Sequence, residues 1–135
     1  MVTPEIAAQL NQLLESERAG ARGVIDMKAE AREGMEAVLD SVARDEARFC
    51  SMLRHHLSRL GYEPSGDTGA FYGKLAARPT LDAKLRLLDR GQSAVVRVLD
   101  ELLPAIDDDA LHRDLVEMRE VHVRNIETCA SYLVD

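Results

Sequence analysis

The stretch that decides the fold is LHRDLVEMREVHVRNIETCASY, residues 111–132. Seven of its residues, most of them apolar, recur at alternating steps of four and three, a spacing that places them on one side of an α-helix. That side carries Leu111, Leu115, Met118, His122, Asn125, Cys129 and Tyr132. Because His122 stands in the middle of this stripe, we expect the imidazole to lie inside the protein.

Three other stretches have the same spacing, and each has one polar residue at the middle of its stripe: Glu17, Glu46 and Gln92. Four helices that meet along these stripes would enclose a polar layer within one apolar core. That core is predicted to contain Leu10, Leu13, Val24, Leu39, Val42, Leu53, Leu85, Leu88, Val95, Leu99, Leu115 and Met118.

Caps and breaks set the order of the elements. The first helix is expected from its cap at Thr3-Pro4 to a break at Gly34, and the second over 35–60. The third is expected from its cap at Thr80 to Pro104, and the fourth after a cap within Asp107–Asp109. The connections within these two pairs are short, so the first and second helices, and the third and fourth, should be antiparallel neighbours. Residues 62–79 are rich in Gly and Pro and too long for a tight turn, which predicts a crossover with a short helix near 71–78. The fold class is therefore all-α: one domain over residues 1–135, an antiparallel four-helix bundle with one long crossover between its second and third helices.

Composition narrows the classes of function. The chain is 46% hydrophobic and only 4% aromatic, and its net charge of −7 without a basic cluster argues against nucleic acid as a partner. Neither a signal peptide nor an apolar run long enough for a membrane helix is visible. Cys50 and Cys129 lack the CxxC spacing of redox or metal sites, so we expect two reduced, packed thiols and a cytoplasmic protein.

This helix order, with a crossover in the middle and a polar residue halfway along each helix, resembles the ferritin-like superfamily, which includes rubrerythrin and bacterioferritin. The resemblance covers nearly the whole chain and implies a di-iron site, built from a carboxylate on each of two helices and a Glu-x-x-His pair on each of the other two. Glu17 and Glu46 match the carboxylates of the first and second helices, and His122 matches the histidine of the fourth.

Three of the six positions depart from this pattern. Phe49 stands where the second helix should carry His, Gln92 replaces the carboxylate of the third helix, and Arg119 replaces the Glu that precedes His122. The chain therefore looks most like a bacterial branch with a degenerate di-iron site.

Two buried carboxylates must be neutralised by a metal, a proton or a cation. Arg119 is expected to be that cation, in a buried polar layer with Glu17, Glu46, Gln92 and His122, because its guanidinium could bridge two carboxylates and would repel a divalent ion. This interpretation expects no metal and no other cofactor.

The main functional hypothesis is a bundle that has lost di-iron chemistry and acts as a small binding or interaction module rather than an enzyme, with its small-molecule or protein partner undefined. The resemblance also favours a homodimer, whose interface would bury apolar side chains outside the stripes, such as Leu14 and Ile25.

The alternative to a binding module is an oxidoreductase or iron-handling protein that binds iron or another divalent metal through Glu17, Glu46 and His122. A second metal site at His55, His56 and His112 is disfavoured, since adjacent histidines on a helix point about 100° apart.

Overall fold

Four long helices account for most of residues 1–133, the part of the chain that the computed structural model describes. They are α1 (Pro4–Met27), α2 (Met35–Arg59), α4 (Leu81–Leu102) and α5 (Asp109–Ala130). The shorter elements are α3 (Phe71–Ala76), in the crossover, and two 3₁₀ turns, η1 (Lys28–Glu30) and η2 (Leu103–Ala105). These residues include no strand, which confirms the predicted all-α class.

The predicted caps begin three of the long helices. Thr3 Oγ1 accepts a hydrogen bond from the third residue of α1 over 3.2 Å, and Thr80 Oγ1 does the same for α4 over 3.1 Å. Asp108 Oδ1 accepts the backbone N–H of Leu111 at the start of α5. Before α2 the chain turns at Gly34, whose φ of 86° is readily adopted only by glycine.

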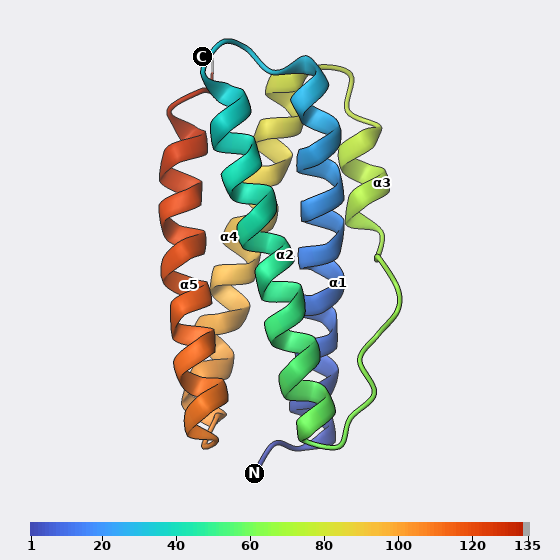
Figure 1. The fold of residues 1–135 in the computed structure, drawn as a ribbon, viewed down its shortest axis with the longest axis vertical. Helices are drawn as coiled ribbons and strands as arrows, with labels where there is room; N and C mark the ends of the chain where they lie inside the picture. The colour runs from blue at the N-terminus through green and yellow to red at the C-terminus, as the bar shows by residue number, and fades with distance from the viewer. Residues whose placement is uncertain (134–135) are drawn as a thin grey trace.

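The helices pair as predicted, α1 with α2 and α4 with α5, each pair antiparallel (Figure 1). Between the pairs, the crossover leaves the lower end of α2 and rises along the outside of α1 to the upper end of α4 (Figure 1). It is held to α1 by Asn11, whose Oδ1 accepts from the backbone of Ser65 over 2.7 Å, and by a Ser65–Glu15 side-chain hydrogen bond. One face of α1 is therefore covered by the crossover, not by another long helix.

All twelve predicted core residues are buried, but they belong to two clusters. One cluster contains Leu10, Leu13, Leu53, Val95, Leu99, Leu115 and Met118, and the other contains Val24, Leu39, Val42, Leu85 and Leu88. Each cluster occupies one half of the bundle because the polar residues of all four helices lie between them. The prediction of a single continuous core is thus corrected.

No helix within residues 1–133 has a segment both long and apolar enough to cross a lipid bilayer.

Candidate metal centre

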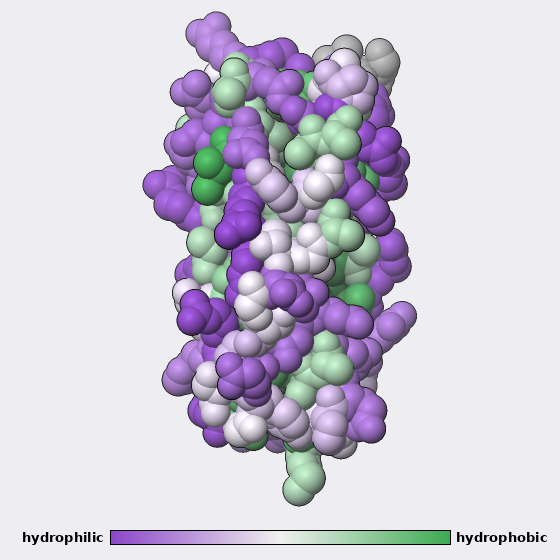
Figure 2. All heavy atoms as spheres, turned by 90° about the vertical axis from the view of Figure 1, so that its right-hand side faces the viewer, coloured by the Kyte–Doolittle hydropathy of each residue, from purple (hydrophilic) through white to green (hydrophobic). Residues whose placement is uncertain are grey.

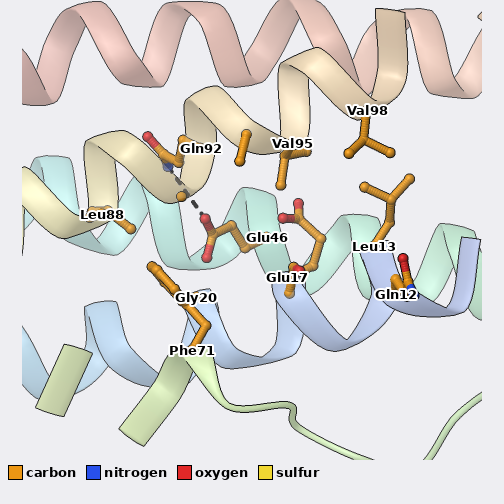
Figure 3. A pocket seen from close by; sticks show the side chains of 13 residues that line it. Gln12, Leu13, Glu17, Gly20, Glu46, Phe71, Leu88, Gln92, Val95 and Val98 are labelled. Atoms are coloured by element: carbon orange, nitrogen blue, oxygen red, sulfur yellow. Dashed lines mark hydrogen bonds between the residues drawn. The ribbon is translucent and has the colours of Figure 1, made fainter. Parts of the chain in front are cut away.

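Four polar side chains, one from each long helix, meet halfway along the bundle. They are Glu17 of α1, Glu46 of α2, Gln92 of α4 and His122 of α5, and none is more than 3% exposed. Figure 3 shows Glu17, Glu46 and Gln92 converging from three of the helices. The sequence placed all four on the inward stripes, and the structure brings them together.

His122 is held in one orientation by its own helix. Its Nδ1 lies 2.9 Å from the Met118 carbonyl oxygen, to which Nδ1–H donates. Nε2 therefore faces Glu17, at 2.9 Å from Oε1 and 3.1 Å from Oε2. Burial by itself would lower the pKa of His122, but the Glu17 carboxylate outweighs burial and raises this pKa to about 9.

Glu46 lies in a less polar environment. Its Oε1 accepts a 3.3 Å hydrogen bond from Gln92 Nε2, while its Oε2 is buried without a partner. Burial, followed by the negative charge of Glu17, raises the pKa of Glu46 well above its ordinary value. The layer thus contains an imidazolium at His122, paired with Glu17, and a Glu46 carboxyl group whose burial favours its protonated form.

Gly20 makes room for this carboxyl group. A Cβ atom at position 20 would lie 2.2 Å from Glu46 Oε2, so any side chain there would displace the carboxyl group. Gly20 therefore lets the Glu46 carboxyl group of α2 lie against the backbone of α1.

Arg119 does not belong to the layer, and the prediction that it neutralises the carboxylates is wrong. Its Nε lies 2.5 Å from Asp100 Oδ1 of α4, and its side chain is 39% exposed. Position 119 is about 60° around the helix from His122, at the edge of the stripe, where Asp100 and water solvate the guanidinium better than a buried layer could. Within residues 1–133, neither Glu17 nor Glu46 pairs with a lysine or an arginine.

Phe49 fills the position where the resemblance implies a histidine ligand. It is 1% exposed, and its ring lies 5.6 Å from the imidazole of His122, between centroids. The phenyl ring shields one side of the imidazole from water, and it offers no atom to a metal.

Glu17, Glu46 and His122 nevertheless form a set of metal-ligand type. One oxygen from each carboxylate and one imidazole nitrogen all lie within 4.8 Å of one another. Two carboxylates and an imidazole suit Fe²⁺, Mn²⁺ or Zn²⁺. The structure thus assembles the ligand set of the alternative hypothesis.

A cavity of about 220 Å³ adjoins this set, between α1 and α4 and beneath α3. Glu17, Glu46 and Gln92 line its inner part, and Phe71 of α3 closes part of its outer side (Figure 3). The Phe71 ring reaches so close to α4 that a Cβ at Gly91 would lie 2.7 Å from it. Sequence reasoning missed this cavity, for which the signal was Gly91, an isolated glycine in the middle of a helix.

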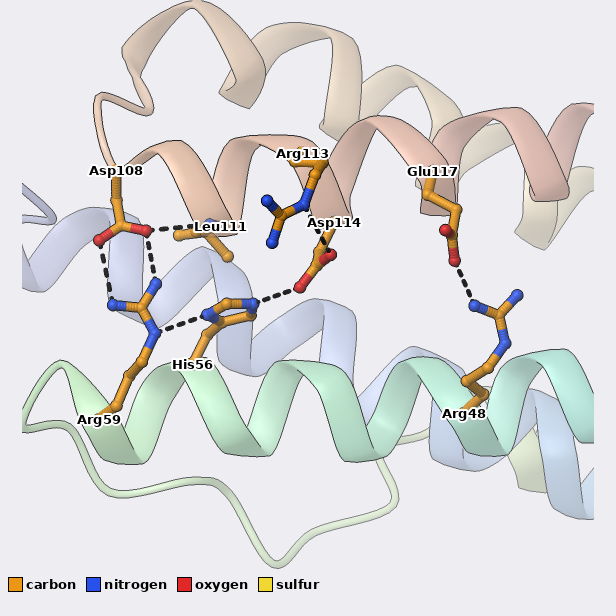
Figure 4. Close-up of polar contacts among 8 residues, drawn as sticks. All are labelled: Arg48, His56, Arg59, Asp108, Leu111, Arg113, Asp114 and Glu117. Carbon is orange, nitrogen blue, oxygen red and sulfur yellow. Dashed lines mark hydrogen bonds and ion pairs between the residues drawn. The ribbon is translucent and has the colours of Figure 1, made fainter.

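His56 belongs to a separate network that joins α2 to α5 (Figure 4). Arg59 Nε donates to His56 Nδ1 over 2.9 Å, so the other ring nitrogen carries the hydrogen that faces Asp114 Oδ2 at 2.7 Å. Arg59 also forms two hydrogen bonds to Asp108. His56 is therefore a packed polar residue, in agreement with the interpretation preferred from the sequence.

A sequence profile for the family described as "Domain of unknown function (DUF6306)" matches residues 4–131. The chain belongs to the DUF6306 family. No curated protein sequence matches this DUF6306 chain. Among solved structures, it is similar to one described as "ferritin like, diiron-carboxylate proteins" from Bacillus anthracis str. Ames, with a TM-score of 0.73 and 15% sequence identity over 95% of this chain and 97% of that one. The fold of the DUF6306 chain is thus ferritin-like, as its sequence predicted.

Proposed function

We propose that this DUF6306 protein binds a single divalent metal ion through Glu17, Glu46 and His122, and that iron is the first candidate for this ion. The observation that carries the proposal is the convergence of three ligand atoms within 4.8 Å in a buried layer. The solved protein of the same fold is described as a diiron-carboxylate protein, which makes iron the first metal to test.

The residues fit such an ion in three respects. Glu46 Oε2 is a buried acceptor without a partner, and a cation would satisfy it. The bond from His122 Nδ1 to the Met118 carbonyl fixes the ring with Nε2 toward the carboxylates, as outer-shell hydrogen bonds do for metal-binding histidines. Finally, a divalent ion would balance the charges of two carboxylates that lie beside a neutral imidazole.

One ion is proposed in place of two because half of the di-iron ligands are missing. Phe49 offers no ligand atom, Gln92 donates its amide to Glu46, and Arg119 is paired with Asp100 outside the layer. The remaining donors are enough for one ion with open positions.

The ion would supply Lewis-acid or redox chemistry at the inner end of the cavity. The protein's own contribution is to hold the two carboxylates and the imidazole on three helices, α1, α2 and α5, and to keep water away with Phe49 and the apolar clusters on either side. Gln92 fixes the orientation of Glu46 by donating to Oε1.

A metal-free binding module is the second candidate. The observation in its favour is that His122 is already paired with Glu17, and that burial raises the pKa of Glu46 well above its ordinary value and so favours the uncharged carboxyl group. In this case the carboxylates serve only to orient the helices.

Metal analysis separates the two candidates. Protein purified without chelator from cells grown with added iron should contain about one metal ion per chain, and Glu46→Gln should contain far less. Glu120→Gln is the matched control, because Glu120 is exposed on α5 and should leave the metal content unchanged. Wild-type protein that contains no metal, and does not bind Fe²⁺, Mn²⁺ or Zn²⁺ in calorimetry, would reject the metal-binding proposal.

A further inference from the structure

The cavity beside the polar layer has apolar walls. Its sides are formed by Leu13 of α1, by Leu88, Ala94, Val95 and Val98 of α4, and by Phe71 of α3. On the face that carries α3, hydrophobic and weakly polar residues are mixed with strongly polar ones in the middle, and strongly polar residues predominate at the margins (Figure 2). Water gains few hydrogen bonds along such walls, so they favour an apolar occupant.

The buried polar side chains of the cavity lie at its inner end, while Gln12 and Ser16 of α1 are less buried polar residues in its lining. Glu46 is 2% exposed and lines the cavity, and its Oε2 has no hydrogen-bond partner. A buried polar atom without a partner costs free energy, which a ligand group placed against it would recover.

The volume indicates the size of the occupant. An apolar cavity of about 150 Å³ is enough to hold benzene, and this one measures about 220 Å³. By that comparison it holds a molecule of about eight or nine non-hydrogen atoms.

We infer that this cavity binds a small, neutral and largely apolar molecule that carries one hydroxyl group, and that the hydroxyl group pairs with Glu46 Oε2. This inference deepens the proposed function and rests on it for the role of the bound molecule, whose hydroxyl group would lie beside the metal ion. Both can use Glu46, because a carboxylate oxygen that binds a cation keeps a second lone pair that accepts an O–H. Binding itself requires only the cavity and Glu46.

The choice of a hydroxyl group follows from the chemistry of the inner end. A hydroxyl both donates and accepts, so it matches Glu46 Oε2 whether or not that oxygen carries a proton. A carboxylate on the ligand would bring another anion beside Glu17, and an ammonium ion can only donate and must lose its hydration shell. A neutral hydroxyl avoids both costs.

Three probes of one shape test the inference: benzyl alcohol, toluene and benzoate. Their binding to chelator-treated protein is followed by NMR through the backbone amides of α1 and α4. Benzyl alcohol should bind saturably, about fivefold more tightly than toluene because of one hydrogen bond of about 1 kcal/mol, and at least about tenfold more tightly than benzoate. Absence of saturable benzyl alcohol binding would overturn the inference.

Variants then locate the site. Ala94→Phe or Val98→Phe fills the cavity from α4 and should weaken benzyl alcohol binding about tenfold or more. Ala8→Phe is the matched control, since Ala8 is an exposed alanine on α1 that does not line the cavity. Unchanged affinity in both cavity variants, with folding verified by circular dichroism, would show that the molecule binds elsewhere and would refute the inference.

Glu46→Met tests the polar end. It replaces the carboxyl group with an apolar side chain of similar length, so toluene binding should persist while the preference for benzyl alcohol disappears. If Glu46→Met still prefers benzyl alcohol to toluene, the role of Glu46 is overturned.

The proposed function and this inference can fail separately. Benzyl alcohol binding by a wild-type protein that takes up no metal would reject the proposed function and leave this inference standing.

Discussion

Glu17, Glu46 and His122 form a buried set that Arg119 does not join. The imidazole is paired with Glu17, and burial raises the pKa of Glu46 well above its ordinary value. Arg119 instead lies at the rim of the bundle with Asp100. At the scale of single residues, the layer is therefore held by the His122–Glu17 ion pair and the Gln92–Glu46 hydrogen bond, whereas the Arg119 guanidinium is paired with Asp100 outside it.

Arg119→Leu tests this arrangement. Because exposed ion pairs add little to stability, the variant should unfold at nearly the same urea concentration as the wild type. Leu115→Ala serves as the reference for a destabilising change in the same helix. If Arg119→Leu proves as destabilising as Leu115→Ala, Arg119 supports the layer after all.

Gly20→Ala should disturb the ligand set more than the fold. The added methyl group would lie 2.2 Å from Glu46 Oε2, and the end of the Glu46 side chain can rotate away from it. Stability should change little, whereas affinity for Fe²⁺, measured by calorimetry, should fall about tenfold or more. Gly73→Ala is the control, because a Cβ at Gly73 meets nothing within 4 Å. Equal metal affinity in the two variants would contradict the placement of Glu46 against Gly20.

At the scale of the helices, the inward stripes provide most of the stability. Leu88 and Leu115 are each at most 1% exposed, on opposite sides of the polar layer. Leu88→Ala and Leu115→Ala should each lower the free energy of unfolding by ~2–5 kcal/mol in urea denaturation. A loss below about 0.5 kcal/mol at both positions would mean that the stripes do not face a packed core.

The start of α5 provides a pH-dependent contribution. The Arg59 guanidinium, together with the backbone N–H of Leu111, lowers the pKa of Asp108 from 3.8 to about 2. Because the folded-state pKa is depressed, the stabilisation is present above pH 3.8 and is lost as the pH falls toward 2.

Asp108→Asn isolates this charge, since asparagine still caps a helix. The variant should be less stable than the wild type in urea at neutral pH, and the difference should vanish as the pH is lowered through this window. A stability difference between variant and wild type that is independent of pH would show that the Arg59–Asp108 ion pair is not its cause.

At the scale of the whole molecule, self-association remains a prediction. Of the two side chains expected at a dimer interface, Leu14 is fully buried within the chain's own core, and only Ile25, at 56% exposure, is available. A dimer would therefore have to use Ile25 and the surface around it. Light scattering should give twice the chain mass of 15.0 kDa at high micromolar concentration, and Ile25→Lys should reduce it to the monomer value.

The sequence by itself determined the helices, their pairing and the four polar positions of the layer. Each of these depends on local signals: the spacing of the stripes, the caps at Thr3, Thr80 and Asp108, and the lengths of the connections. Helical geometry fixes which side chains share a face, so His122 could be placed inside from its neighbours alone.

Only the tertiary structure decided which partners those side chains take. Arg119 is long and lies at the edge of its stripe, so its partner depended on whether Asp100 or Glu17 came within reach, and helix spacing along the chain does not determine that. The cavity likewise exists because Phe71, from a crossover without periodicity, lies against Gly91 and covers the space between α1 and α4. Both outcomes depend on the distance between helices far apart in the sequence, which no pattern within one helix encodes.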